Sequence, residues 1–190
     1  MGEDVCTRDE NRILVTERLV LRPPELSDAE DIWPLVSDSK LTRFLAWEPH
    51  REIADTRAMI ASLREAQERR SAYHWIISEN RRIVGLTSLI DLRMKHLAWV
   101  LNRAELAYWI APENQGQGLA TEAAEAVLKF GFLRLGLKKI RVAHASKNAA
   151  SKAVAEKLGF KKYCEERKAF RKYNQWHSLI WYDLLREEFM

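Results

Sequence analysis

The stretch of sequence that decides the fold reads Asn114-Gln115-Gly116-Gln117-Gly118-Leu119-Ala120-Thr121. It stands between a predicted strand, 103–110, and a predicted helix, 119–135. Gly116 and Gly118 have no side chains, so a ligand can approach this backbone closely. The free N–H groups at the start of the helix carry about half a positive charge, which attracts an anion such as a pyrophosphate. An ordinary loop before a helix remains the alternative, and spacing alone leaves both open.

Two common phosphate-binding loops do not match this stretch. The loop lacks the Gly-Lys-Ser/Thr ending of a P-loop, which disfavours a Walker-type nucleotidase. It also lacks the third glycine of the dinucleotide fingerprint and an acidic residue after the next strand, which disfavours a nicotinamide enzyme.

Outward from this loop, hydrophobic periodicity predicts a mixed α/β layer fold. Ser27 and Glu30 form an expected capping box at the start of the first helix. Gly85 marks an expected bulge or close approach within a strand. The segment Asp91–Asn102 is expected to be a basic, aromatic connection. The expected helices are 27–36, 52–70, 119–135 and 148–158, and the expected strands are 16–22, 72–77, 83–90, 103–110, 139–144, 160–168 and 176–185.

Length and composition bound the class of protein. The chain has 190 residues, of which 47 % are hydrophobic and 31 % charged, as in a folded domain of ordinary size. We expect a flexible arm at 1–12 and a single domain at 13–190. Two cysteines form no disulfide framework and no zinc spacing, so we expect a reducing, cytoplasmic location and no metal. The acidic start Met1–Val5 is no signal peptide, and no apolar run is long enough to span a bilayer.

Several motifs together resemble one enzyme family. Gln115-x-x-Gly118-x-Ala120 resembles the acetyl-coenzyme A signature of the GNAT N-acetyltransferase superfamily. Asn148-x-x-Ser151 followed by Leu158-Gly159-Phe160 resembles that family's next helix and strand. The start, 16–29, and the strand 104–110 resemble the RimJ/RimL-like subgroup, which acetylates ribosomal-protein N-termini. The resemblance covers residues 13–188 in the right order.

The resemblance implies a fold and a reaction. The fold is a mixed, mostly antiparallel sheet of six to seven strands flanked by four helices. Enzymes of this family move acetyl from acetyl-coenzyme A directly to an amine, without a covalent acyl-enzyme. The reaction needs a polarised acetyl carbonyl, a free amine and a donor for the departing thiolate. The resemblance places the carbonyl against backbone N–H groups of 105–110, where the family has a bulge.

The resemblance also implies the cofactor-binding residues. The pantetheine arm is expected beside the end of the strand and Asn148, and the pyrophosphate on the glycine loop. Lys152 is expected near the ribose phosphate. The predicted cofactor-binding set is Trp109, Ile110, Gln115, Gly116, Gln117, Gly118, Leu119, Ala120, Thr121, Asn148 and Lys152.

Two residues are candidates for catalysis. Many relatives carry a tyrosine acid seven residues after the asparagine, but this chain has Ala155 there. Ser151 shares a helix face with Asn148 and is the expected donor to the thiolate. Glu105 is the candidate base, since partial burial would raise its pKa. A solvent-facing serine and a glutamate paired with a cation are the alternatives. Among the histidines, His144 is the first to check.

The seven tryptophans suggest where the acceptor binds. Trp47, Trp99 and Trp176 fall in connections that this family uses to line the acceptor cleft, and Tyr108 is assigned to the same pocket. They predict a pocket with aromatic walls. Trp33, Trp75 and Trp181 are expected in the core.

Three function classes follow. The first is an acetyl-coenzyme A-dependent N-acetyltransferase acting on a protein N-terminal amine or a small amine, with ribosome association as a further expectation. The second is a sensor or scaffold that only binds acyl-coenzyme A. The third is a nucleic-acid-binding protein, whose affinity would fall steeply with salt. We expect no membrane partner, and a monomer or a homodimer.

Overall fold

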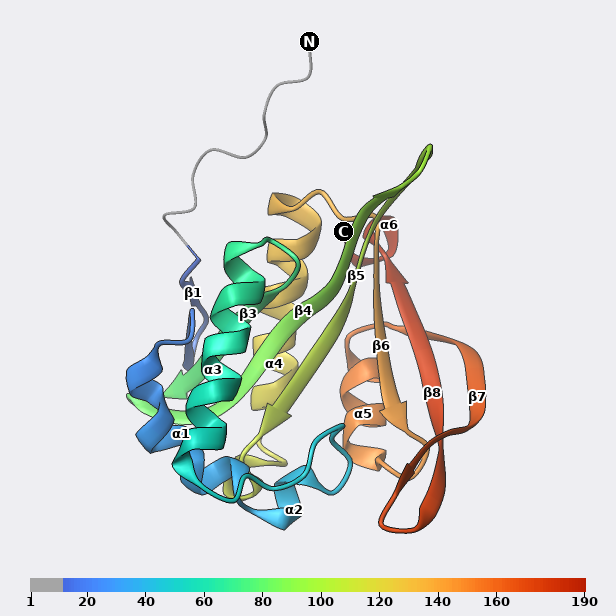
Figure 1. Ribbon diagram of the computed structural model, residues 1–190. Helices are drawn as coiled ribbons and strands as arrows, with labels where there is room; N and C mark the ends of the chain where they lie inside the picture. The colour runs from blue at the N-terminus through green and yellow to red at the C-terminus, as the bar shows by residue number, and fades with distance from the viewer. Residues whose placement is uncertain (1–11) are drawn as a thin grey trace.

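The computed structural model describes residues 12–190 (Figure 1). Most of the predicted arm, 1–11, lies outside the described residues. The strands are β1 (Leu14–Val15), β2 (Leu19–Arg22), β3 (Tyr73–Glu79), β4 (Arg82–His96), β5 (Trp99–Ile110), β6 (Lys139–Ala145), β7 (Lys161–Lys172) and β8 (Gln175–Leu185). The helices are η1 (Leu26–Asp28), α1 (Ala29–Val36), α2 (Ser39–Thr42), α3 (Ile53–Glu68), η2 (Pro112–Asn114), α4 (Leu119–Lys129), the π-helical η3 (Phe130–Arg134), α5 (Ala149–Lys157) and α6 (Arg186–Phe189).

All described strands join in one sheet of order β1-β2-β3-β4-β5-β6-β8-β7. Only the β5–β6 pair is parallel in the described chain, so the predicted mixed, mostly antiparallel sheet is confirmed. The sheet has eight strands and the described chain six α-helices, more than the six to seven and four that were expected. The additional elements are the short β1, α2 and α6, which are too brief to leave a periodic pattern.

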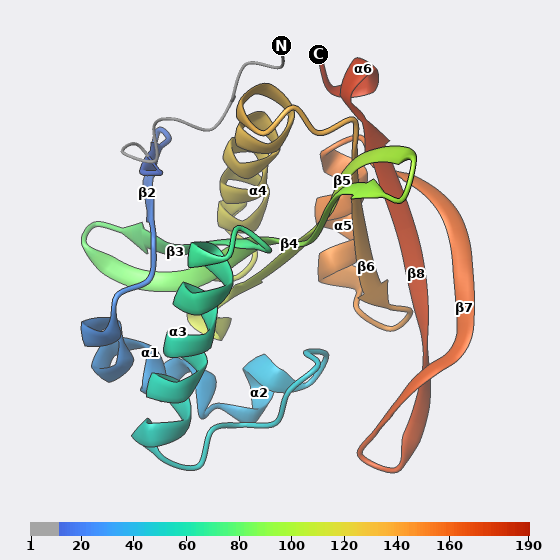
Figure 2. The ribbon, with the colours of Figure 1, turned by 45° about the horizontal axis from the view of Figure 1, so that its top comes forward.

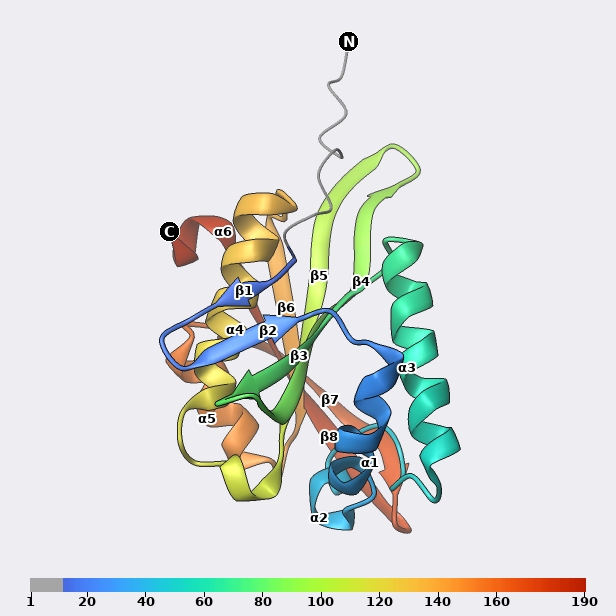
Figure 3. The ribbon, with the colours of Figure 1, turned by 90° about the vertical axis from the view of Figure 1, so that its left-hand side faces the viewer.

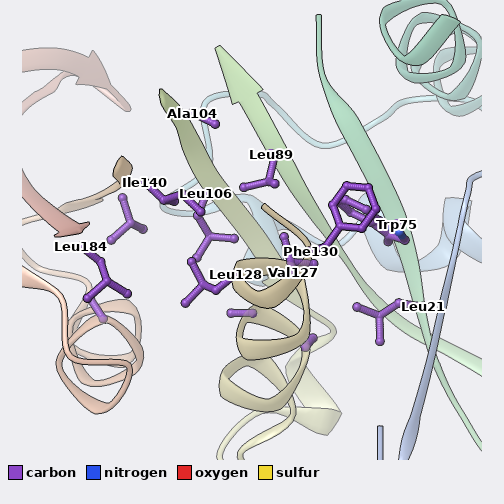
Figure 4. Packing of buried hydrophobic residues seen from close by; sticks show 14 of the residues in the cluster. Leu21, Trp75, Leu89, Ala104, Leu106, Val127, Leu128, Phe130, Ile140 and Leu184 are labelled. Atoms are coloured by element: carbon purple, nitrogen blue, oxygen red, sulfur yellow. The ribbon is translucent and has the colours of Figure 1, made fainter. Parts of the chain in front are cut away.

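The sheet buries a hydrophobic core on each face. Trp75 and Ile77 of β3 pack with α4 and α5, whereas Ile76 between them packs with α1 and α3. This alternation is the period of two that a strand imposes. Figure 4 shows Leu128 of α4 near Leu106 of β5, and Phe130, the first residue of η3, beside Trp75 of β3. Figure 3 shows the two helical layers on opposite sides of the sheet.

Strands β5 and β6 separate soon after they meet. Only Arg103–Glu105 pair with Lys139–Arg141, and the remainder of β5 diverges from β6 (Figure 1). The pairing of β5 with β4 is regular from Ile110 back to Glu105. The bulge expected within 105–110 is therefore absent from the described β4–β5 ladder, where the irregularities fall beyond Ile90. The opening between β5 and β6 leaves one edge of β5 available to a ligand.

Gly85 was predicted as a bulge or a close approach, and both are confirmed. Ile77 pairs with Gly85 while Ser78 pairs with Ile83, so Val84 is an extra residue in β4. A Cβ atom at Gly85 would collide with the carbonyl oxygen of Trp109. This glycine lets β4 approach the end of β5.

Two local predictions were wrong. The first helical segment begins at Leu26, before the expected cap Ser27. The carboxylate of Asp28 accepts the backbone N–H of Glu25 at 2.8 Å and pairs with Arg22 at 2.5 Å. This ion pair fixes Asp28 as the capping acid in place of Glu30.

The expected connection 91–102 is instead a hairpin. β4 runs to His96 and β5 begins at Trp99, so the two strands extend well past the sheet (Figure 1). The turn contains no Gly, Asn or Asp, which are the residues that signal a hairpin in sequence. In residues 12–190, no helix combines the length and the apolar character needed to cross a membrane.

Candidate active site

Two adjoining cavities lie where β5 and β6 diverge. The glycine-loop cleft, of about 470 Å³, is lined by 114–116 and 118–121, the end of β5, the first turns of α5 and the α2 region. The β5–β6 cavity, of about 490 Å³, is lined by 105–108 of β5, 142–145 of β6 and parts of β7 and β8. The residues that line both cavities are Phe44, Leu45, Tyr108, Asn148 and Ser151.

The glycine loop has the backbone that its sequence predicts. Gly116 and Gly118 have φ angles of +77° and +82°, in the left-handed region that favours glycine. A Cβ atom on Gly116 would meet no described atom within 4 Å, so its surface is open. Gly118 is the N-cap of α4, and no described side chain caps this helix. The first amides of α4 are thus free to bind an anion from the cleft.

The two glutamines of the loop have different surroundings. The Gln115 side chain donates to the Ile110 carbonyl at 2.8 Å, which ties the loop to the end of β5. Gln115 lines the cleft together with Trp109 and Ile110. Gln117 is not among the described lining residues, and its carbonyl accepts from Arg18 at 3.1 Å.

An ion pair that sequence reasoning missed braces the loop from outside. Arg18 pairs with Glu122 of α4 at 2.6 Å, and Thr16 donates to the same carboxylate at 2.5 Å. Burial raises the pKa of Glu122, but hydrogen bonds from Thr16 and Arg18 outweigh it and hold the pKa below its ordinary value. No spacing in the sequence signals this contact, because the partners lie more than 100 residues apart.

The cations of the glycine-loop cleft are also different from those expected. Lys40, Arg43 and Lys157 line it. The predicted Lys152 is not among the described lining residues, and it pairs with Glu156 one turn along α5 at 3.6 Å. Lys157 shares the cleft face of α5 with Val154, three residues earlier.

The predicted residues Tyr108 and Ser151 meet at the wall between the cavities. Their hydroxyl oxygens lie 2.9 Å apart, and the tyrosine also donates to the Ser151 carbonyl at 3.2 Å. Asn148 is the N-cap of α5, and its side-chain oxygen accepts from the Ser151 N–H at 3.2 Å. Burial raises the pKa of Tyr108 to about 12, although the bond to Ser151 opposes this. The tyrosine is therefore a neutral hydrogen-bonding group at physiological pH.

Glu105 lies in the β5–β6 cavity beside a cation. Its carboxylate is 3.7 Å from Arg141, which also contacts Asp91 at 3.1 Å and stacks on the Trp181 ring. Burial raises the pKa of Glu105, Arg141 opposes the rise, and Asp91 adds to it. Glu105 is therefore both half-buried and paired with a cation.

The aromatic walls come from other residues than the predicted tryptophans. Trp99 is 71 % exposed in the hairpin and Trp176 is 58 % exposed, and neither is among the described lining residues. Trp47 is partly buried and packs against the core cluster that includes α1 and α3. Trp181, expected in the core, lines the β5–β6 cavity, and Trp33 is 37 % exposed. Trp75 is buried, as predicted. The aromatic walls of the β5–β6 cavity are Phe44, Tyr108, Phe170 and Trp181.

His144 lines the β5–β6 cavity as well. Its Nδ1 lies 2.8 Å from the Ala145 carbonyl oxygen, which can only accept, so Nδ1 donates this hydrogen bond. Nε2 is buried and has no hydrogen-bond partner in the described chain.

Comparisons with known proteins give one consistent result. Residues 18–161 match the family model described as an acetyltransferase (GNAT) domain. The chain is 32 % identical to the uncharacterized N-acetyltransferase YoaA of Bacillus subtilis, over 79 % of this chain and 83 % of that protein. It is 28 % identical to the spermidine N(1)-acetyltransferase of Escherichia coli K12, over 74 % of this chain and 71 % of that protein.

A solved structure shares the fold. RimL, a ribosomal L7/L12 alpha-N-protein acetyltransferase in complex with coenzyme A, superposes with a TM-score of 0.83 at 22 % identity, covering 91 % of this chain and 97 % of that chain. The predicted resemblance to the RimJ/RimL-like proteins is confirmed at the level of the fold. The family match over most of the chain confirms the class of enzyme, and the chain belongs to the GNAT family of acetyltransferases.

Proposed function

We propose that this chain binds acetyl-coenzyme A in the glycine-loop cleft and transfers acetyl directly to a primary amine in the β5–β6 cavity. The observation that carries the proposal is the shared wall between the cavities. Tyr108, Ser151 and Asn148 face both spaces, so a group in one cavity can meet a group in the other there. Acetyl transfer needs this meeting of two substrates.

The cleft fits the chemistry of acetyl-coenzyme A. The open surface of Gly116 and the uncapped amides of α4 suit a diphosphate. Lys40, Arg43 and Lys157 add positive charge at the same cleft. The free edge of β5 beyond Glu105 offers backbone groups to the pantetheine amides. When bound, acetyl-coenzyme A supplies an activated acetyl thioester.

Ser151 and Tyr108 act on the thioester side in this proposal. Ser151 donates a hydrogen bond to the departing sulfur, as the resemblance implies. Tyr108 keeps its proton at physiological pH and holds the Ser151 hydroxyl in place. Asn148 fixes the first turn of α5, and with it the position of Ser151.

Glu105 is the proposed base on the acceptor side. It lines the β5–β6 cavity and its raised pKa makes it a better proton acceptor than an ordinary glutamate. The amine must lose a proton before it can attack, and a carboxylate in the cavity can accept it directly or through water.

Two acceptor classes suit this site. The motifs of 16–29 and 104–110 favour a protein N-terminal α-amine, such as that of a ribosomal protein. The Escherichia coli relative is named for spermidine, which favours a small polyamine. We further propose that residues 13–190 form a single domain that works in the cytoplasm, as a monomer or a homodimer.

The test is an amine panel with acetyl-coenzyme A as the donor and thiol release as the readout. Turnover with a peptide N-terminus or a polyamine supports the enzyme and ranks the two acceptor classes. Micromolar binding of acetyl-coenzyme A without turnover on any amine would instead favour a sensor. Salt-sensitive binding to RNA, without turnover, would favour a nucleic-acid-binding protein.

A further inference from the structure

The side chain of Lys172 joins two segments that are far apart in the sequence. Lys172 is the last residue of β7, and its side chain is only 7 % exposed. Its Nζ donates to the backbone carbonyls of Thr42 at 2.7 Å, Leu45 at 2.7 Å and Trp47 at 2.8 Å. An ammonium group has three N–H donors, so these three carbonyls satisfy it completely.

Each side of this contact needs the other. A buried ammonium is costly unless all its donors are bonded. Leu45 and Trp47 follow α2 where the chain is irregular, so their carbonyls belong to no ladder, whereas the carbonyl of Thr42, the last residue of α2, also accepts the Leu45 N–H at 3.0 Å. Glu48 lies 4.0 Å from Nζ but is 65 % exposed, so the neutral carbonyls are the main partners. Lys172 is thus the link that gives the segment a fixed position.

The joined segments carry side chains of the candidate site. Leu45 carries one of the bonded carbonyls, and Phe44 is the residue before it. Both side chains line the two cavities. Phe170 and Arg171, next to Lys172 in β7, also line the β5–β6 cavity. Figure 2 shows the segment after α2 reaching away from α3 towards the β6 and β8 side of the molecule. The two segments held together by Lys172 thus both contribute to the wall of the β5–β6 cavity.

We propose that Lys172 is a positioning residue for the acceptor amine, which it serves by fixing 42–47 against the end of β7. The inference rests on the proposed function. With the link in place, Phe44 and Leu45 are already ordered when the acceptor enters. Without the link, Phe44 and Leu45 must become ordered when the acceptor binds, and the entropy lost in that step lowers the affinity for the acceptor. The segment 42–47 also supplies Arg43, Phe44 and Leu45 to the glycine-loop cleft, so loss of the link loosens that part of the cofactor site too. The glycine loop and the first amides of α4 lie outside the link, so the contacts proposed for the diphosphate remain.

The experiment compares Lys172→Met with Lys162→Met. Lys162 is in the same strand, its side chain is 52 % exposed, and its contact is a surface pair with Glu165. For Lys172→Met we expect the acceptor KM to rise about 10-fold, from the loss of order in two side chains. We expect kcat to change by less than about 3-fold, and the Kd of acetyl-coenzyme A to rise by less than the acceptor KM, because the glycine loop and α4 are untouched. Lys162→Met should resemble the wild type.

Hydrogen exchange gives a readout independent of turnover. In Lys172→Met the amides of 42–47 should exchange faster, while those of α4 should not change. Lys172→Arg keeps a charged donor, so its acceptor KM and its exchange rate at 42–47 should lie between those of the wild type and Lys172→Met. This variant replaces Lys172→Met in the test if the methionine variant fails to fold. An unchanged acceptor KM together with unchanged exchange at 42–47 would overturn the proposal. If the wild type turns over no amine, the proposed function fails, and faster exchange in the variant would still show the link itself.

Discussion

The hydroxyl oxygen of Tyr108 lies 2.9 Å from that of Ser151, at the wall shared by the glycine-loop cleft and the β5–β6 cavity. The two residues come from β5 and from the first turn of α5, 43 positions apart. Tyr108 is buried, and its raised pKa keeps it protonated. The pair therefore provides a neutral hydrogen-bonding group where the two proposed substrates meet.

Ser151→Ala should lower kcat by about 100-fold, the lower range for loss of a positioned proton donor. The Kd of acetyl-coenzyme A should be unchanged, because the loop and α4 are untouched. Steady-state kinetics and calorimetric titration measure the two quantities. Tyr108→Phe should give a smaller fall in kcat, since it removes only the partner of the serine. A normal rate for Ser151→Ala would remove this serine from the mechanism.

Gly116→Ala should raise the Kd of acetyl-coenzyme A about 10-fold or more, because the new Cβ atom occupies the open surface of the cleft. Gly136→Ala is the matched control. Gly136 also has a positive φ, +69°, and open space around its Cβ position, but it lies outside the described lining of the cleft. Both variants should lose about 1–2 kcal/mol of unfolding free energy from the left-handed backbone. Equal effects of the two on acetyl-coenzyme A binding would contradict the site.

Glu105→Gln should change the pH profile of kcat/KM. Burial raises the pKa of Glu105 above its ordinary value of 4.5, with Arg141 opposing. A base works when ionised, so the wild-type rate should rise with pH through this raised pKa and level above it. The glutamine variant should be slower and should lack this acidic limb. An acidic limb of the same shape in both proteins would show that another group, such as His144, accepts the proton.

Lys157→Met and Lys152→Met separate two candidate cations on α5. Lys157 lines the glycine-loop cleft, whereas Lys152 pairs with Glu156 at 3.6 Å. We expect Lys157→Met to weaken the binding of acetyl-coenzyme A by about 2- to 5-fold, as for the loss of one exposed charge pair. Lys152→Met should have a smaller effect, and the difference should shrink in high salt. A larger effect of Lys152→Met would instead show that Lys152 is the cation of α5 that contacts acetyl-coenzyme A.

The glycine loop and the sheet around it could be predicted from sequence because their signals are local. Gly116 and Gly118 stand between a strand and a helix, and Gly85 marks a real bulge. Ser151 follows Asn148 within one helical turn, so their shared place at the start of α5 followed from spacing. Local periodicity also gave the long helices α3 and α4.

The remaining features depend on contacts between distant segments. Lys172 reaches Thr42 across 130 positions, and Arg18 reaches Gln117 across 99. Nothing in the local sequence marks such partners. The tryptophans show the same limit, because Trp99 lies in a hairpin whose turn has no glycine or asparagine. The sequence shows where these tryptophans fall along the chain, but it does not show which side of the sheet each one faces.

The most direct test of the central claim is thiol release from acetyl-coenzyme A with matched pairs of acceptors. Each pair contains a free amine, either a peptide N-terminus or a polyamine, and its fully acetylated counterpart. Direct transfer predicts rapid release with at least one free amine and none with its blocked partner. Binding of acetyl-coenzyme A with no release for any free amine, or equal release for free and blocked partners, would contradict it.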